Sequence, residues 1–180
     1  MADILEEHLE ELAFLFSQRS IALDSPAYTM RELKMLDERI EAHTQGLLVA
    51  GERLPSVAGP ALGGDDPWAA CAAAYALLRS GQQEAARQVA EALARADEKL
   101  LPGLGQALRH GPIGLIKEEL RQAVAAGPVP VAAVAAEALA VHGLLERQER
   151  RLAEFFASDN AQVRQAAWRI VALLDADGKP

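Results

Sequence analysis

Apolar residues recur at spacings of three and four along most of the chain, which is the pattern of amphipathic α-helices. The first stripe predicts a helix over residues 4–23. A second stripe follows a capping box, in which the Thr29 and Glu32 side chains each accept from the other's backbone N–H. That stripe consists of Leu33, Leu36, Ile40, His43 and Leu47. Two regular stripes, separated by the helix-breaking segment 24–26, predict an antiparallel helical hairpin over residues 1–54.

Residues 55–66 read PSVAGPALGGDD and are rich in proline and glycine, so we expect a loop and an internal boundary there. Asp66 and Pro67 then suit the N-cap and the first position of a new helix. Beyond this point the apolar pattern predicts helices over residues 67–80, 83–96, 100–109, 112–126, 130–141, 144–157 and 161–175.

Three glycines divide these later helices at regular intervals. Gly81, Gly111 and Gly143 are spaced by 30 and 32 residues, and each follows a predicted helix. A period of this size with two helices per unit is typical of stacked helical repeats. We therefore expect an all-α chain, in which the hairpin is followed over residues 67–180 by about three antiparallel helix pairs in a short α-solenoid, forming one compact domain overall. A plain helical bundle with coincidental glycine spacing is the alternative.

The segment 152–174, LAEFFASDNAQVRQAAWRIVALL, gives the repeat a specific character. Its pattern Leu-x-x-Phe-Phe-x-x-Asp-x-x-x-Val-Arg-x-x-Ala resembles a HEAT repeat in its bacterial HEAT-like form. The resemblance implies structural roles for three residues. Asp159 would cap the second helix, Val163 would face the core, and Arg164 would pair across the seam between repeats.

The hairpin carries a second resemblance. The segments 11–16 (ELAFLF), 36–43 (LDERIEAH) and 46–51 (GLLVAG) are similar to the start of a bacterial HEAT-like family found beside type VI secretion genes. This resemblance implies a non-enzymatic accessory role in toxin delivery, with an adaptor chaperone, an effector or a spike component as the partner.

Composition and charge narrow the function classes. Apolar residues make up 51% of the chain and aromatic residues only 4%, which favours closely packed helices. The net charge of −8 argues against nucleic-acid binding. Residues 1–54 contain 11 acidic and 5 basic residues, so their net charge is −6. This bias indicates either a solvated helical face or an acidic docking surface for a basic partner.

The sequence contains no arrangement typical of an enzyme or a cofactor site. We expect no catalytic residues, no metal ligands and no cofactor, because metal-ligand spacings, a nucleophile elbow and a phosphate-binding loop are all missing. His43 is expected at the hairpin seam, either as a core or boundary histidine or as a ligand or pH switch. His110 and His142 are expected to meet helix-end carbonyls, and Cys71 to fill the core. Acidic residues near the N-terminus and the lack of a long apolar run favour a cytoplasmic protein outside the membrane.

Five side chains are candidate protein-binding residues: Trp68, Arg147, Arg150, Arg151 and Trp168. The arginines belong to a segment of mixed charge, which is either a solvated face or the rim of a groove. Trp168 either covers the end of the last repeat or is an exposed hot spot. Two other classes stay open. One is a HEAT-like enzyme of the alkyl-base glycosylase or bilin lyase type, and the other is a structural oligomerisation module, since the sequence leaves the oligomeric state open.

Overall fold

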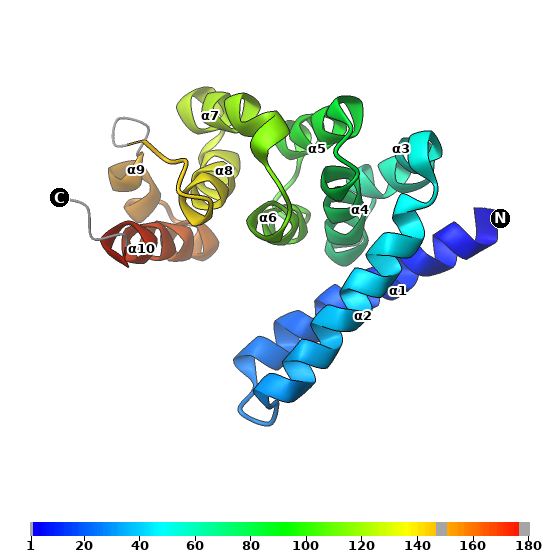
Figure 1. Ribbon diagram of the computed structural model, residues 1–180. Coiled ribbons are helices and arrows are strands. Elements are labelled where there is room, and N and C mark those ends of the chain that lie inside the picture. Colours follow the sequence, from blue (N-terminus) through cyan, green and yellow to red (C-terminus); the bar gives the residue numbers. More distant parts are fainter. Residues whose placement is uncertain (1, 147–150, 177–180) are drawn as a thin grey trace.

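The computed structural model describes residues 2–146 and 151–176, and this part of the chain contains helices and turns but no strand (Figure 1). The all-α class is therefore confirmed. The α-helices are α1 (Ala2–Asp24), α2 (Met30–Leu48), α3 (Leu54–Ala58), α4 (Pro67–Arg79), α5 (Gln83–Arg95), α6 (Leu101–His110), α7 (Lys117–Ala126), α8 (Val129–Val141), α9 (Leu152–Phe156) and α10 (Ala161–Ala176). Short 3-10 helices occur at η1 (Gly51–Arg53), η2 (Gly59–Gly63) and η3 (Gly114–Ile116).

Helices α1 and α2 form the predicted antiparallel hairpin, which projects from one side of the molecule (Figure 1). Its turn is closed by the predicted capping box. The backbone N–H of Glu32 donates to the Thr29 hydroxyl at 3.3 Å, and the backbone N–H of Thr29 donates to the Glu32 carboxylate at 2.8 Å. Leu12 of α1 and Leu47 of α2 are fully buried. Arg19 and Asp37 join the two helices at 2.6 Å on the outside.

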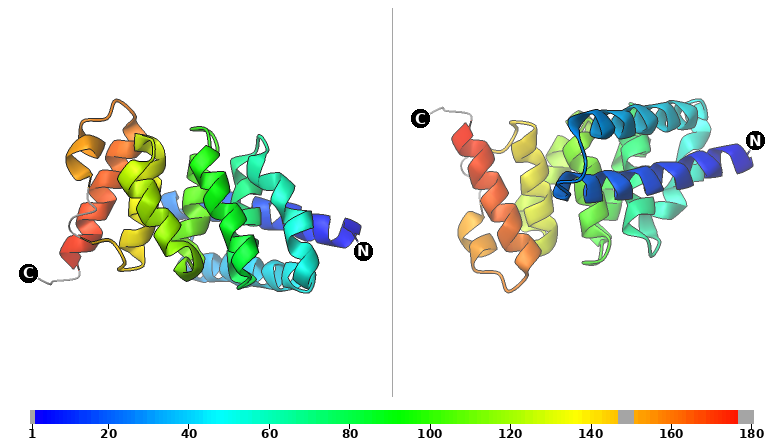
Figure 2. Two further views of the ribbon diagram at one scale, coloured as in Figure 1. Left: turned by 90° about the horizontal axis from the view of Figure 1, so that it is seen from above. Right: turned by 90° about the horizontal axis from the view of Figure 1, so that it is seen from below.

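Helix α4 is the element around which the others pack. Every residue from Ala70 to Leu78 is buried, so the helix is apolar on all sides, as expected for a helix enclosed by protein. It contacts α1, α2, α3, η2, α5 and α6. In Figure 1, α4, α6, α8 and α10 lie in one row, and α5 and α7 lie in a second row above it. The hairpin lies across the first row and leaves α10 uncovered (Figure 2).

Two helix contacts in the first row depend on residues without a side chain. A Cβ added at Gly103 would lie 1.7 Å from the Pro67 carbonyl oxygen, so α6 approaches the start of α4 more closely than alanine permits. Gly105 lies against Val134 of α8, where an added Cβ would be 3.3 Å from the nearest methyl group. Small residues at these positions let the backbones come together and fix the spacing of the row.

Residues 55–63 differ from the predicted loop, because α3 and η2 occupy them. Pro55 and Pro60 each fall in the first turn of a short helix, where the missing N–H has no helical partner to lose. Leu54, Ala58 and Leu62, four residues apart, are buried against the core. The prediction of a loop was wrong here because proline was interpreted as a breaker when it begins a helix.

The end of the chain also differs from expectation. A single helix was predicted over residues 144–157, but residues 144–146 are not helical and α9 begins only at Leu152. Gly143 has a φ of 67°, and the N–H of Leu144 donates to the Leu139 carbonyl at 2.8 Å, which ends α8 with a left-handed cap. Likewise, Pro112 does not open a helix directly, since α7 begins at Lys117 after η3.

Candidate protein-binding groove

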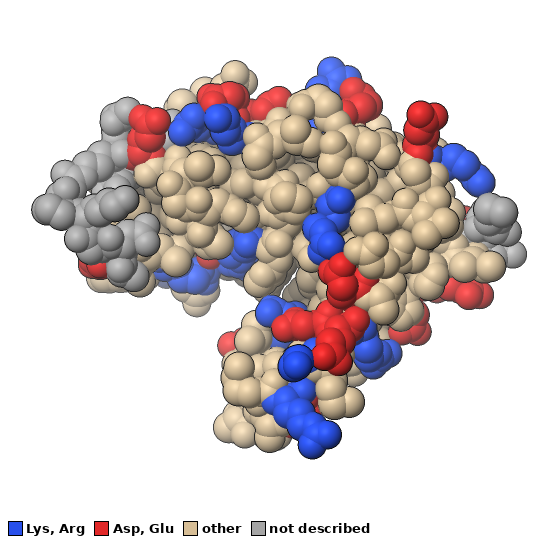
Figure 3. All heavy atoms as spheres, in the orientation of Figure 1, with Lys and Arg blue, Asp and Glu red and all other residues tan. Residues whose placement is uncertain are grey.

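A hollow of about 570 Å³ lies between the end of the hairpin and the first row of helices. Its walls come from α1, α4, α6, α8 and α10, and the space between hairpin and body is visible in Figure 3. We call this hollow the groove. The groove is the surface at which the two parts of the molecule, the hairpin and the stacked helices, face one another, so a bound polypeptide could contact both.

Trp68 connects the groove to a second hollow. Asp66 caps α4 by accepting from the Trp68 N–H at 2.8 Å, and Pro67 occupies the first turn, so the sequence places Trp68 at the start of the helix, half-buried. The indole lines the groove on one side. On the other side it lines a hollow of about 380 Å³ shared with Phe14 of α1. The predicted N-cap is confirmed, and the predicted role of Trp68 in binding stays a prediction.

In the wall away from the hairpin, one buried carboxylate links three helices. Glu137 of α8 is only 4% exposed. It accepts from Arg109 of α6 at 2.6 Å and from Arg169 of α10 at 2.6 and 2.9 Å. Three hydrogen bonds from two guanidinium groups compensate the loss of water around a buried charge. They also engage both carboxylate oxygens, so Glu137 acts here as a tie between three helices.

Sequence reasoning missed this triad. Arg109, Glu137 and Arg169 lie 28 and 32 residues apart, close to the period set by the glycines, and they alternate in sign. Opposite charges at the same place in successive helix pairs were the available signal. The signal becomes specific only when the stacking order of α6, α8 and α10 is known.

The loop before α10 corrects one of the predicted structural roles. Asn160, rather than Asp159, caps the helix, because its side-chain oxygen accepts from the Gln162 N–H at 2.9 Å. The Asn160 amide also donates to Glu98 at 3.2 Å, at the edge of the groove. Asn160 directly precedes the first helical residue, whereas Asp159 lies one residue too early to cap.

The predicted role of Arg164 was wrong, and the predicted position of Val163 is confirmed. Arg164 donates to the Ser158 and Asp159 carbonyl oxygens, both at 2.8 Å, so it closes its own turn and does not pair across a seam between repeats. Val163 is 3% exposed and lines the groove, as expected for a core-facing position.

Arg151 lies away from the groove. Its guanidinium donates to the Val124 and Gly127 carbonyl oxygens at 3.0 and 2.9 Å and pairs with Glu154 at 2.6 Å. The hydrogen bonds to Glu154 raise the pKa of Arg151. The side chain therefore satisfies carbonyl groups at the end of α7. Arg147 and Arg150 lie outside the described residues.

Trp168 is 65% exposed and lies edge-on to Phe156, with ring centroids 4.9 Å apart. It covers part of α9 and keeps most of its surface in solvent. It does not line the groove.

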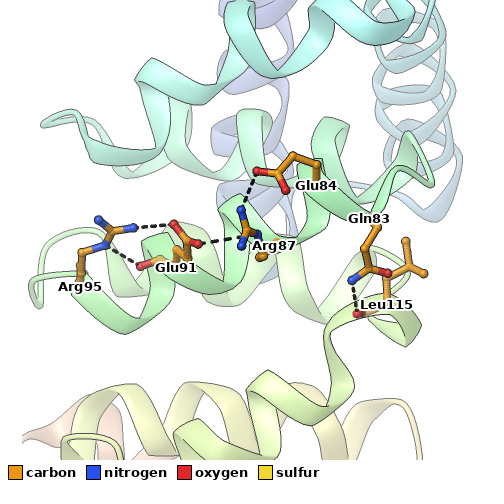
Figure 4. A network of polar contacts seen from close by, with 6 residues as sticks. All are labelled: Gln83, Glu84, Arg87, Glu91, Arg95 and Leu115. Atoms are coloured by element: carbon orange, nitrogen blue, oxygen red, sulfur yellow. Dashed lines mark hydrogen bonds and ion pairs between the residues drawn. The ribbon is translucent and has the colours of Figure 1, made fainter.

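On α5, by contrast with the triad around the buried Glu137, the charged side chains are exposed and pair within one helix (Figure 4). Glu84, Arg87, Glu91 and Arg95 pair along the same helix, with contacts of 2.8 to 3.8 Å. Gln83 donates to the Leu115 carbonyl at 3.1 Å and ties α5 to η3. Exposed pairs of this kind contribute little to stability, and they describe a solvated face.

The histidines serve contacts between helices. The His142 Nε2 lies 3.0 Å from the carbonyl oxygen of Leu108, in the last turn of α6, as expected for a histidine at a helix end. His43 meets His8 across the hairpin. Among residues 2–146 and 151–176, no three His, Cys, Asp or Glu side chains gather closely enough to hold a metal ion. Cys71 is fully buried, and burial raises the pKa of its thiol, which confirms its role as a core residue.

Comparisons of the chain with family models, with curated proteins and with solved structures give no match. Within the described part of the chain, every helix is too short or too polar to cross a bilayer.

Proposed function

We propose that this chain is a non-enzymatic scaffold of HEAT-like repeats in a short α-solenoid, and that it binds another protein in the groove. The supporting observation is the groove, whose walls are supplied by the hairpin and by the first row of helices. Stacked helices give a long surface whose side chains can vary without disturbing the backbone, which suits protein recognition.

The chemistry of the groove favours binding over catalysis. The buried carboxylate of the groove, Glu137, accepts three hydrogen bonds from two arginines, so its negative charge is already paired within the protein. The remaining polar lining includes the side chains of Gln106, Gln162 and Gln165. Primary amides both donate and accept hydrogen bonds, and they are suited to a polypeptide backbone.

The family resemblance supplies the biological setting of the proposal. The segments that resemble the type VI secretion family lie on α1 and α2, at residues 11–16, 36–43 and 46–51. We therefore propose an accessory factor or co-chaperone that helps an adaptor chaperone, an effector or a spike component in toxin delivery. The chain would act in the cytoplasm, before export of the toxin.

Site-specific photo-crosslinking in cells with an intact secretion cluster tests this function. A photoreactive phenylalanine replaces Gln106 in the groove or, as the control, Gln45, which is exposed on α2. We expect the Gln106 position, and not the Gln45 position, to capture an adaptor, an effector or a spike component. Equal capture at both positions, or capture of none of these proteins, would remove the proposal. Crosslinks between two copies of the chain would favour an oligomerisation module instead.

A further inference from the structure

We infer that the groove and the adjoining hollow bind a partner segment in which a large apolar side chain is flanked by lysine or arginine residues. This inference rests on the proposed function and specifies the chemistry of the partner. It follows from three features of the hairpin wall: an exposed apolar centre, unpaired carboxylates and the negative end of a long helix.

The apolar centre lies where α1 meets the start of α4. Leu9, Ala13, Phe14, Trp68 and Ala69 line the hollow of about 380 Å³. Phe14 is 53% exposed, and Ile21, two turns further along the same side of α1, is 63% exposed. A phenyl ring half in solvent and an indole that line the same hollow offer a place for one large apolar side chain of a partner.

One carboxylate lies beside this centre and a second lies at the end of the same helix. Glu10 lies one turn before Phe14 on α1 and lines the same hollow, where no lysine or arginine contributes to the lining. Asp24, at the other end of α1, lines the groove. The only lysine or arginine of α1 is Arg19, which pairs with Asp37 of α2. The two arginines of the groove lie on the opposite wall and are both bound to Glu137.

The C-terminal end of α1 adds to the negative electrostatic potential of these carboxylates. A helix carries partial negative charge at its C-terminus, and basic side chains in the last turn commonly offset it. The last turn of α1 contains no basic side chain and ends at Asp24. Dipole and carboxylate therefore add together at a point that faces the groove, and they attract a cation from a partner.

These positions define a spacing for the partner. Phe14 and Asp24 are ten residues apart on a straight helix, which corresponds to about 15 Å at 1.5 Å per residue. Glu10 lies about 6 Å to the other side of Phe14 along the axis. A segment that runs along α1 thus meets a carboxylate, an apolar site and a second carboxylate in that order.

Fluorescence anisotropy with two matched peptides tests this chemistry. One is a labelled amphipathic peptide of leucine, lysine and glutamine, and the other has glutamate in place of every lysine. We expect the lysine peptide to bind, with affinity that falls at high salt, and the glutamate peptide to bind at least about tenfold more weakly.

Matched variants separate this site from the general acidity of the chain. Glu10→Lys with Asp24→Lys should weaken binding of the lysine peptide by at least about fivefold, and Phe14→Ser should do the same. Glu38→Lys with Glu52→Lys changes the net charge equally at exposed positions outside both hollows, and should leave binding within about twofold. Thermal melts confirm that each variant is folded.

Four outcomes discriminate between explanations. Equal binding of both peptides, or an equal loss in the control variant, would overturn the inference and leave the photo-crosslinking result untouched. A dimer in sedimentation velocity that dissociates on Phe14→Ser would assign the hollow to a second copy and overturn it too. Charge-selective peptide binding without secretion-specific crosslinks would support the inference while removing the role in toxin delivery.

Discussion

His8 and His43 face one another across the hairpin, with their Nδ1 atoms 3.1 Å apart and their rings arranged edge to face. A hydrogen bond between these atoms needs one protonated and one bare nitrogen, so two imidazolium groups cannot share it. Glu11 and Arg39 are the other charged groups that act on His43.

Stability should therefore fall in mild acid. Burial lowers the pKa of His43, and the charge of His8 lowers it further. The unfolded chain then binds a proton more readily than the folded one, so the free energy of unfolding decreases as the pH falls below the usual imidazole value of 6.5. Urea unfolding at about pH 7.5 and about pH 5.5 measures the decrease. His43→Gln should make it smaller, and an unchanged decrease in this variant would show that His43 is not responsible.

Gly46 provides a second test of the histidine contact. A Cβ there would lie 2.6 Å from the His8 Nε2, so Gly46→Ala must displace the imidazole and should destabilise the hairpin. In a His8→Ala background the obstacle is gone, and the same change should stabilise α2 by about 0.5–1 kcal/mol, because alanine favours helix over glycine. Chemical denaturation of the wild type, the two single variants and the double variant gives the coupling free energy between Gly46→Ala and His8→Ala. A Gly46→Ala effect of the same sign in both backgrounds would contradict the explanation.

The triad around Glu137 predicts strong non-additivity. Arg169→Ala leaves the carboxylate paired with Arg109 and should cost about 1 kcal/mol of the free energy of unfolding. Removing both arginines leaves a buried, unpaired charge and should cost about 3–5 kcal/mol. Urea unfolding of the singles and the double measures the difference. If the double variant equals the sum of the singles, the two arginines act independently and the triad has no shared role.

Two glycines of α6 should respond very differently to alanine. Gly103→Ala places a methyl group against the backbone of Pro67 and should cost about 3 kcal/mol or more, because backbone must move. Gly105→Ala meets only a Val134 methyl group at 3.3 Å, and its cost is offset by the helix preference of alanine, so the net change should be within about 1 kcal/mol. Thermal unfolding of both variants provides the comparison. Similar effects at the two sites would mean that α4 and α6 are not held as closely as described.

Cys71 should be unreactive in the folded protein. The side chain is fully buried, so a reagent cannot reach it. Burial also raises the pKa of its thiol, so little of the reactive thiolate is present. Labelling with a disulfide reagent should follow the unfolded fraction along a urea titration. Since the chain contains one cysteine, Cys71→Ser gives the blank. Rapid labelling in native buffer would show that α4 opens on its own.

The features that the sequence predicted well are local ones. Thr29 with Glu32, and Asp66 with Pro67, specify helix starts through contacts within three residues, and both appear as expected. Gly81 and Gly143 end helices with φ values of 68° and 67°, which glycine adopts most readily. Gly111 ends α6 in an extended conformation, so equal spacing did not imply equal geometry.

The candidate site was harder to anticipate. Trp68 was a candidate because it lies at a predicted helix start beside the segment rich in proline and glycine, and the structure places it in the groove. Phe14 and Glu137 were missed, because the exposure of one and the burial of the other depend on how helices from distant parts of the chain pack. Arg151 was a candidate for a binding rim because its local sequence is charged, whereas its guanidinium also donates to carbonyl groups 24 and 27 residues away.

The buried alanines of α4 limit where this molecule can change. Because α4 packs against both the hairpin and α6, a larger residue in place of one of its alanines between Ala70 and Ala76 would displace a neighbouring helix, so this part of α4 has almost no freedom to vary. Sequence variation among descendants of this chain should therefore concentrate on the groove walls, while α4 stays nearly constant and keeps the recognition surface in place.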